Sequence, residues 1–254
     1  MTLRAENLTL GHPGKVLCQH LDVTMQPGEC WGIMGRNGCG KSTLLHALGG
    51  LHKPLGGEIS MAGRSVQAIP RLEMARKMGL LLQEEASYFT GTVREYVTLG
   101  RFPHQGMLPG WQEDNETQVQ YALACMELTK MAFRSVNTLS GGERQRVRLA
   151  MLLAQMPDIF ALDEPLLHLD IGHQVAVMKL FRAFASEQRK TVIMVLHDPL
   201  GASRYCDHVL LLYGNGKAES GPTRDILNRR NLEQLYQCNM QELIIHGETH
   251  YVPQ

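Results

Sequence analysis

The sequence predicts an α/β fold that combines a largely parallel sheet with an N-terminal antiparallel sheet and an inserted helical segment. Three observations lead to this prediction. A short apolar strand at residues 30–34 runs into a glycine-rich loop and then a helix at residues 41–48. Apolar runs at residues 159–162 and 191–196 are typical of strands covered on both faces. A helix at residues 174–188 connects these two strands, so we expect them to lie parallel in one sheet.

Shorter patterns complete the expected order of elements. We expect N-terminal strands at residues 8–10, around Leu17 and at 21–25, with turns at 11–14 and 27–28. We expect a further core strand at residues 80–82 and helices of the inserted segment at 92–99, 115–128 and 140–155. The tail should hold a helix at residues 232–237 and a hairpin through Gly247.

The composition narrows the classes of function. Lys and Arg total 25, as do Asp and Glu, and this balance argues against a dedicated nucleic-acid binder. The six cysteines form no Cys-x-x-Cys pair, which favours a reduced cytosolic protein over a zinc site or a disulfide framework. Residues 1–6 lack the apolar core of a signal peptide, and no apolar run approaches the roughly 18 residues of a membrane span. We therefore expect a chain that does not itself cross a membrane.

The strongest motif is the glycine-rich loop GRNGCGKST, which fits the pattern G-x-x-x-x-G-K-[ST] between a strand and a helix. Glycines allow backbone N–H groups to turn toward phosphate oxygens, and the helix N-terminus adds partial positive charge. We expect Lys41 to reach the β and γ phosphates of ATP and the Ser42 hydroxyl to bind Mg²⁺. The predicted nucleotide-binding residues here are Gly35, Arg36, Asn37, Gly38, Cys39, Gly40, Lys41, Ser42 and Thr43.

Two carboxylates close the apolar strand at residues 159–162. Asp163 and Glu164 follow it directly, and in a phosphate-loop fold this strand end lies beside the loop. Asp163 is then expected to hold Mg²⁺ through water, and Glu164 to orient and deprotonate the attacking water as general base. Taken alone, paired acids after a strand also fit a solvated turn.

The stretch LSGGERQR at residues 139–146 contains a capping box, in which Ser140 and Glu143 begin a helix. It also resembles the LSGGQ signature of ABC ATPases, with Glu143 at the last position. The resemblance covers nearly the whole chain. It implies a phosphate-loop NTPase fold of ABC type, ATP hydrolysis with Mg²⁺, and a head-to-tail homodimer. In that dimer Ser140, Gly141 and Gly142 close over the phosphate loop of the second copy.

Three further positions match this family in the expected order. Gln83 matches the Q-loop glutamine of the family. The resemblance implies that this residue binds Mg²⁺ and senses the attacking water. Asp170, after Leu169, matches the D-loop, and His197 matches the switch histidine that contacts the γ phosphate. The catalytic set implied by the resemblance is therefore Glu164, His197, Lys41 and Gln83, and the metal set is Ser42, Gln83 and Asp163.

Some positions depart from the family pattern. Leu166, shortly before the D-loop, stands where threonine is common in the family. We find no aromatic residue placed to stack on adenine, and His12 is the nearest candidate. Cys39 replaces the more usual serine or alanine. Because it lies beside Lys41 and a helix N-terminus, we expect a lowered pKa of the thiol and inhibition by alkylators, with protection by ATP.

These assignments predict one ABC ATPase domain spanning residues 1–254. Residues 1–86 and 157–230 form its nucleotide-binding core and residues 87–156 its helical subdomain. Residues 231–254 form a tail that packs on the core. The sequence TVREYVTLGRFPH after residue 91 resembles the ATPase subunits of importers for iron-siderophore, heme and vitamin B12.

That resemblance implies a transmembrane permease docked near Gln83 and the helical subdomain, an indirect link to a substrate-binding protein, and a peripheral place on the cytoplasmic face of a bacterial inner membrane. The alternative is a soluble ABC ATPase that acts on proteins or nucleic acid without a membrane partner. A third option, a regulator that only binds nucleotide, fits poorly with the presence of both Glu164 and His197.

Overall fold

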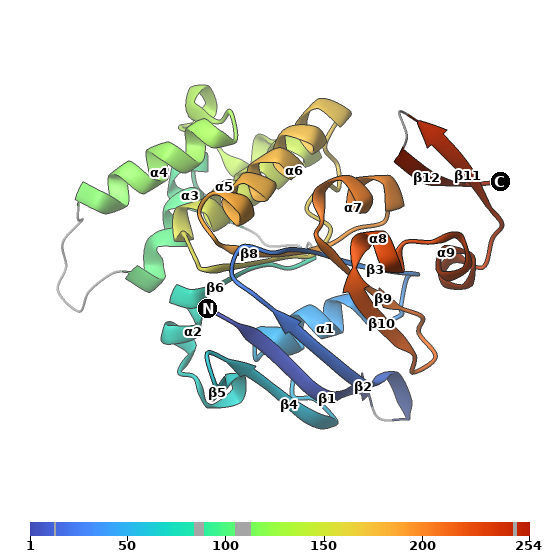
Figure 1. Cartoon of the computed structure of the whole chain (residues 1–254). Coiled ribbons are helices and arrows are strands. Elements are labelled where there is room, and N and C mark those ends of the chain that lie inside the picture. Colours follow the sequence, from blue (N-terminus) through green and yellow to red (C-terminus); the bar gives the residue numbers. More distant parts are fainter. Residues whose placement is uncertain (13, 84–88, 105–112, 246–247) are drawn as a thin grey trace.

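A six-stranded sheet forms the centre of the computed structural model, which describes all residues except 13, 84–88, 105–112 and 246–247. Its order is β10-β9-β3-β8-β7-β6, and β9, β3, β8, β7 and β6 run parallel while β10 lies antiparallel at one edge (Figure 1). The bounds are β3 Cys30–Gly35, β6 Met78–Leu81, β7 Ile159–Leu162, β8 Thr191–Val195, β9 His208–Leu212 and β10 Ala218–Pro222.

The alternation of side chains along the central strands builds two separate cores. In β7, Phe160 and Leu162 join one buried cluster, whereas Ile159 and Ala161 join the other. The first cluster also contains side chains of α5 (Gly141–Gln155) and α6 (Ile171–Ser186), and the second contains α1 (Lys41–Leu48) and the N-terminal sheet. Because successive side chains of a strand point to opposite faces, strands covered on both sides read as continuous apolar runs.

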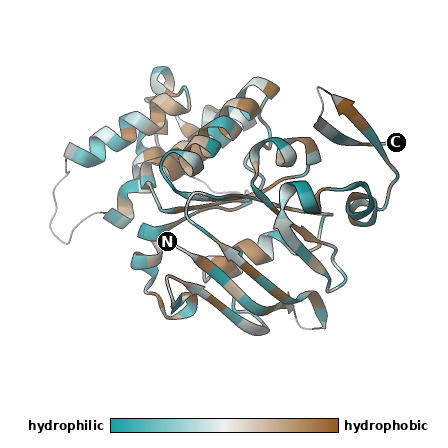
Figure 2. Cartoon of the chain, in the orientation of Figure 1, coloured by the Kyte–Doolittle hydropathy of each residue, from teal (hydrophilic) through white to brown (hydrophobic). Residues whose placement is uncertain are grey.

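The N-terminal sheet is antiparallel, with order β2-β1-β4-β5. Its strands are β1 Leu3–His12, β2 Lys15–Met25, β4 Gly56–Met61 and β5 Arg64–Ser65. Buried and exposed residues alternate along much of β1 and β2, and Figure 2 shows the same alternation of hydrophobic and hydrophilic segments. One face of this sheet therefore packs on the core, and the other faces solvent.

The remaining elements surround these sheets. The other helices are α2 Arg71–Lys77, α3 Val93–Thr98, α4 Glu113–Cys125, α7 Pro199–Tyr205, α8 Thr223–Ile226 and α9 Arg229–Tyr236, and short 3₁₀ turns occupy Val66–Ala68, Leu99–His104, Thr129–Met131 and Val136–Thr138. A hairpin of β11 (Met240–Ile245) and β12 (Glu248–Pro253) follows α9. Figure 1 shows α3, α4 and α5 toward one end of the molecule and this hairpin at the other.

The α/β fold class is confirmed, and most of the predicted elements are present with different ends. The strands expected around Leu17 and at residues 21–25 are one strand, β2, and no prediction covered β4, β5 and α2 or the elements from α7 to α8. The helix between β7 and β8 begins earlier than predicted, because the Asp170 side chain caps it by accepting a hydrogen bond from the N–H of His173. The strand predicted at residues 80–82 is instead β6, Met78–Leu81, in register with β7. The predicted turn residue Gly247 lies outside the described residues, and the strands on either side pair as expected.

Polar contacts join the helical segment to the sheet core. The Arg76 side chain donates to the carbonyl of Pro103 at 2.6 Å, and Gln155 donates from the end of α5 to the carbonyl of Ala75 at 2.5 Å. Within the segment, the buried Arg101 donates to Asn115 at 2.8 Å. The division into core, helical subdomain and tail stays a prediction. Across the described part of the chain, every helix is too short or too polar to span a bilayer.

Candidate active site

The loop that joins β3 to α1 has the backbone of a phosphate cradle. Gly38 and Gly40 adopt φ of 75° and 109°, in the left-handed region that L side chains rarely occupy. A Cβ at Gly40 would also lie 3.0 Å from the Cβ of Leu17. Gly40 caps α1 without any side-chain hydrogen bond, so the first N–H groups of α1 are not satisfied by a cap. Such a helix N-terminus is suited to bind an anion.

Lys41, the first residue of α1, is only 6% exposed and bends back over this loop. Its ammonium group donates to the carbonyls of Gly35 at 2.8 Å and Arg36 at 3.1 Å. An ammonium group has three donors, so one remains for an incoming oxygen. The loop thus holds a buried positive charge at the helix end.

Asp163 lies next to this charge at the end of β7. It is 3% exposed, and its Oδ2 atom is buried without a hydrogen-bond partner. Burial raises the pKa of the Asp163 carboxyl, and the hydrogen bond from the Ser42 hydroxyl opposes this shift. A buried carboxylate with an open oxygen beside a serine hydroxyl is a donor set suited to Mg²⁺. Ser42 and Asp163, predicted from separate motifs, are brought together here.

Glu164 and His197 meet at the edge of the same site. Their Oε1 and Nε2 atoms are 2.7 Å apart, although 33 residues separate them in the chain. The Glu164 backbone has φ of 50°, an uncommon conformation for a residue with a side chain. Strain of this kind persists only where surrounding contacts hold it, and it often occurs at functional sites.

A buried amide from α5 holds the strained turn. Gln145, 4% exposed, donates to the carbonyls of Pro165 at 3.0 Å and Glu164 at 3.4 Å. Its carbonyl accepts from Arg148 at 2.9 Å, and Arg148 also donates to the carbonyl of Leu82. Sequence reasoning missed both Gln145 and Arg148. The only signal was their place on the signature helix, and their contacts are non-local.

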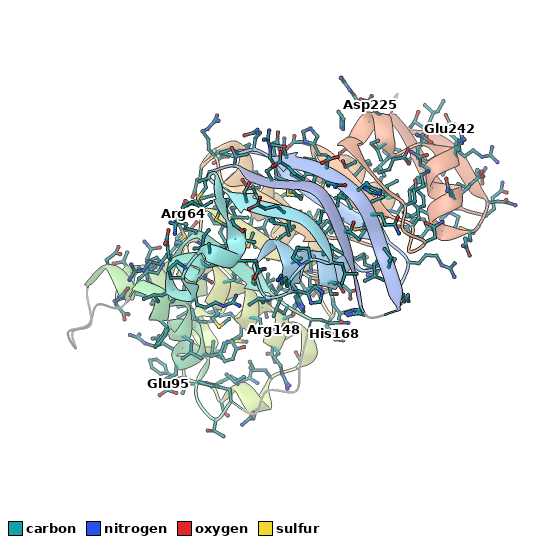
Figure 3. The ribbon with its side chains drawn as sticks, turned by 90° about the horizontal axis from the view of Figure 1, so that it is seen from below. Arg64, Glu95, Arg148, His168, Asp225 and Glu242 are labelled. Atoms are coloured by element: carbon teal, nitrogen blue, oxygen red, sulfur yellow. The ribbon has the colours of Figure 1, made fainter. Side chains whose placement is uncertain are left out.

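The Gln145–Arg148 pair links two predicted site regions. Leu82 immediately precedes Gln83, which is exposed, and Glu164 is the predicted general base. Figure 3 labels Arg148 close to the junction of the helical segment and the sheet core. Residues 84–88, which follow Gln83 in the chain, lie outside the described residues.

The signature turn begins α5 as the capping box predicts. The Ser140 hydroxyl accepts from the N–H of Glu143 at 3.3 Å, and the Glu143 carboxylate accepts from the N–H of Ser140 at 2.8 Å. A Cβ at Gly142 would lie 2.8 Å from the carbonyl oxygen of His168, and one at Gly141 would lie 3.4 Å from its ring. Within one chain, the two glycines therefore permit close packing against the segment before Asp170.

Asp170 and His12 each contact a histidine: His173, close to Asp170 in the sequence, and His52, distant from His12 in the sequence. The hydrogen bond from the N–H of His173 is the largest influence that lowers the pKa of the exposed Asp170 carboxyl. His12, exposed at the end of β1, packs edge-on against His52 with ring centroids 5.7 Å apart. Its predicted stacking on adenine stays a prediction.

The expected lowering of the pKa of the Cys39 thiol is wrong. The residue is 4% exposed, and burial raises the pKa of its thiol, although the Lys41 charge opposes this shift. The sequence placed a positive charge beside the thiol correctly. It gave no indication that the side chain turns inward, where desolvation dominates. The raised pKa and the burial of the thiol both disfavour reaction with alkylators.

Comparison with known proteins places this arrangement in a family. The family model described as ABC transporter matches residues 18–167. The ferric enterobactin transport ATP-binding protein of Escherichia coli (strain K12) is 38% identical over 234 residues, which cover 92% of this chain and 86% of the relative. The hemin import ATP-binding protein of Pseudomonas entomophila (strain L48) is 40% identical over 228 residues, covering 87% and 88%.

Solved structures agree. A metal-chelate type ABC transporter in an inward-facing conformation matches with a TM-score of 0.85 at 30% identity, covering 100% of this chain and 97% of the other. A dimeric ATP-binding cassette in a post-hydrolysis state, bound to ADP and Pi, matches with a TM-score of 0.77 at 28% identity, covering 87% and 99%. This chain therefore belongs to the ABC transporter family and is an ATP-binding, ATP-hydrolysing member of it.

Proposed function

We propose that this chain is the ATPase subunit of an importer for a metal chelate or related cofactor, of the siderophore, heme or cobalamin class. The observation that best supports ATP hydrolysis is the 2.7 Å contact between Glu164 and His197 beside the buried Asp163. The import class is supported by relatives named for ferric enterobactin and hemin import that match along most of their length. The alternative, an ABC ATPase without a membrane partner, has no such support among these relatives.

The residues divide the chemistry between them. The residues of the phosphate loop, 35–43, hold the phosphates of ATP. Ser42 and Asp163, with Gln83, would hold Mg²⁺, which would neutralise phosphate charge when bound. Glu164 accepts the proton of the attacking water, and its position is set by Gln145 and His197. Lys41 and His197 stabilise the charge that develops on the transferred phosphoryl group.

The second half of each ATP site belongs to another copy of the chain. Ser140, Gly141 and Gly142 lie at a helix N-terminus, which is a second anion site. One chain does not need two γ-phosphate sites, whereas two chains arranged head to tail do. The dimeric cassette of known structure supports this arrangement. Asp170 would then contact the partner copy.

Dimer closure would move a membrane partner. We propose that the permease docks beside Gln83 and the helical segment, at the cytoplasmic face of the membrane, and that it receives its cargo from a substrate-binding protein. The Gln145–Arg148 pair joins Leu82 to the Glu164 turn, so it is placed to couple docking to hydrolysis.

Co-purification tests this function. A tagged full-length chain, isolated from detergent-solubilised membranes of the cells that make it, should carry a polytopic membrane protein. Deleting that partner should abolish uptake of an iron chelate or heme supplied to the cells. Recovery without a membrane protein, or uptake that is unaffected by the loss of this chain, would remove the import assignment.

A further inference from the structure

The last turn of α9 touches two loops of the ATP site. The Tyr236 hydroxyl donates to the carbonyl of His197 at 3.1 Å. The next residue, Gln237, accepts a hydrogen bond from Arg36 of the phosphate loop through its Oε1 atom. Two consecutive side chains near the C-terminus thus reach both the loop after β8 and the loop after β3.

Helix α9 is itself firmly placed. Leu232 and Leu235 are 0% and 1% exposed and belong to the same buried cluster as the central strands. Asn228 caps the first turn by accepting from the N–H of Asn231 at 3.0 Å. Glu233 accepts from the N–H of Met240 at 3.0 Å, which fixes the exit of the chain. The end of α9 is therefore a rigid support for the two loops.

The contact with His197 bears on catalysis because it holds the backbone of a residue that carries a catalytic ring. His197 lies between β8 and α7, and its ring is half exposed, with a side-chain exposure of 48%. Burial raises the pKa of the Tyr236 phenol, and the nearby Asp198 carboxylate raises it further. The hydroxyl consequently stays protonated and serves as a donor to the His197 carbonyl throughout the physiological range.

We propose that Tyr236 and Gln237 are positioning residues for ATP hydrolysis: Tyr236 sets His197 against Glu164, and Gln237 holds Arg36 and with it the phosphate loop. Neither side chain needs to touch the nucleotide. The inference rests on the proposed roles of Glu164 and His197. It makes the C-terminal helix part of the catalytic apparatus.

Steady-state ATPase measurements on the full-length chain test each contact. Tyr236→Phe removes one hydroxyl and should lower kcat about three- to tenfold, the range of one neutral hydrogen bond, with KM for ATP changed by less than about twofold. Gln237→Leu should instead raise KM. Gln237→Glu keeps an acceptor for Arg36 and should restore KM to within about twofold of the parent. Gln234→Leu, on the same helix, is the matched control and should leave both constants unchanged.

A double-mutant cycle separates positioning from simple stability. If Tyr236 acts through His197, Tyr236→Phe should have no further effect on kcat in a His197→Ala background. An unchanged kcat in the single variant, or an equal loss in both backgrounds, overturns the role of Tyr236. A KM that Gln237→Glu does not restore overturns the role of Gln237. Normal activity of Glu164→Gln would instead contradict the proposed function, and this inference with it.

Discussion

The phosphate loop and the turn at Glu164 lie in one site but are built in different ways. The loop is local: Gly38, Gly40 and Lys41 are close in sequence, and Lys41 bonds to carbonyls five and six residues earlier. The turn at Glu164 depends on Gln145, 19 residues away, and on His197, 33 residues away. A local site persists wherever its segment folds, whereas a strained non-local one requires the assembled core. Substitutions in the two regions should therefore have different consequences.

The largest effect is expected at the strained turn. Glu164→Gln keeps the shape of the side chain but removes the base, so hydrolysis should fall by roughly 10²–10⁴ while ATP still binds. Single-turnover hydrolysis and ATP binding, measured on the same preparation, check both statements. Near-normal turnover would show that another group accepts the proton.

In the phosphate loop, a substitution should mainly weaken the binding of ATP. Lys41→Ala removes a buried charge-assisted donor and should weaken ATP affinity by about 10- to 150-fold, corresponding to roughly 1.5–3 kcal/mol. Titration with a fluorescent ATP analogue measures it. Lys179, on α6, offers a surface lysine control, and Lys179→Ala should bind normally. Wild-type affinity in the Lys41 variant would contradict the proposed role of Lys41 in binding the phosphates of ATP.

Gln145→Leu tests whether the strained turn needs its distant support. It leaves the carbonyls of Glu164 and Pro165 without their donor, so kcat should fall about tenfold with little change in KM. The melting temperature should also fall, by about 2–4 °C for each kcal/mol lost in a chain of this size. Gln120→Leu, on the surface of α4, is the control. An unchanged kcat would show that the turn holds its conformation unaided.

The smallest expected effect concerns stability. Because the pKa of Asp163 is raised in the folded chain, its ionisation disfavours folding at neutral pH, and stability should increase as pH falls through that pKa. Asp163→Asn should therefore raise the melting temperature of the nucleotide-free chain, by about 2–4 °C for each kcal/mol gained in a chain of this size. Added Mg²⁺ and ATP should stabilise the parent more than the variant. A lower melting temperature for the variant at neutral pH would contradict the expectation that burial of the ionised Asp163 carboxylate destabilises the folded chain.

The sequence alone determined the parts that depend on local chemistry. The glycines and Lys41 of the phosphate loop, the paired acids after β7 and the Ser140–Glu143 capping box are short patterns whose geometry follows from neighbouring residues. Apolar runs such as residues 159–162 gave the core strands, because burial on both faces leaves no room for alternation. The fold class followed from these runs and from the crossover between β7 and β8.

Tertiary structure decided the remaining features of the site, because these features depend on contacts between residues that are distant in the sequence. Gln145 and Tyr236 have no local pattern that marks them, and their importance appears only when α5 and α9 pack against the site. The direction of the Cys39 pKa shift was decided in the same way: the neighbouring charge was visible in the sequence, but the burial that outweighs it was not. The motifs thus predicted which groups bind phosphate, and tertiary packing determined which of these groups are strained, buried or held in place by distant residues.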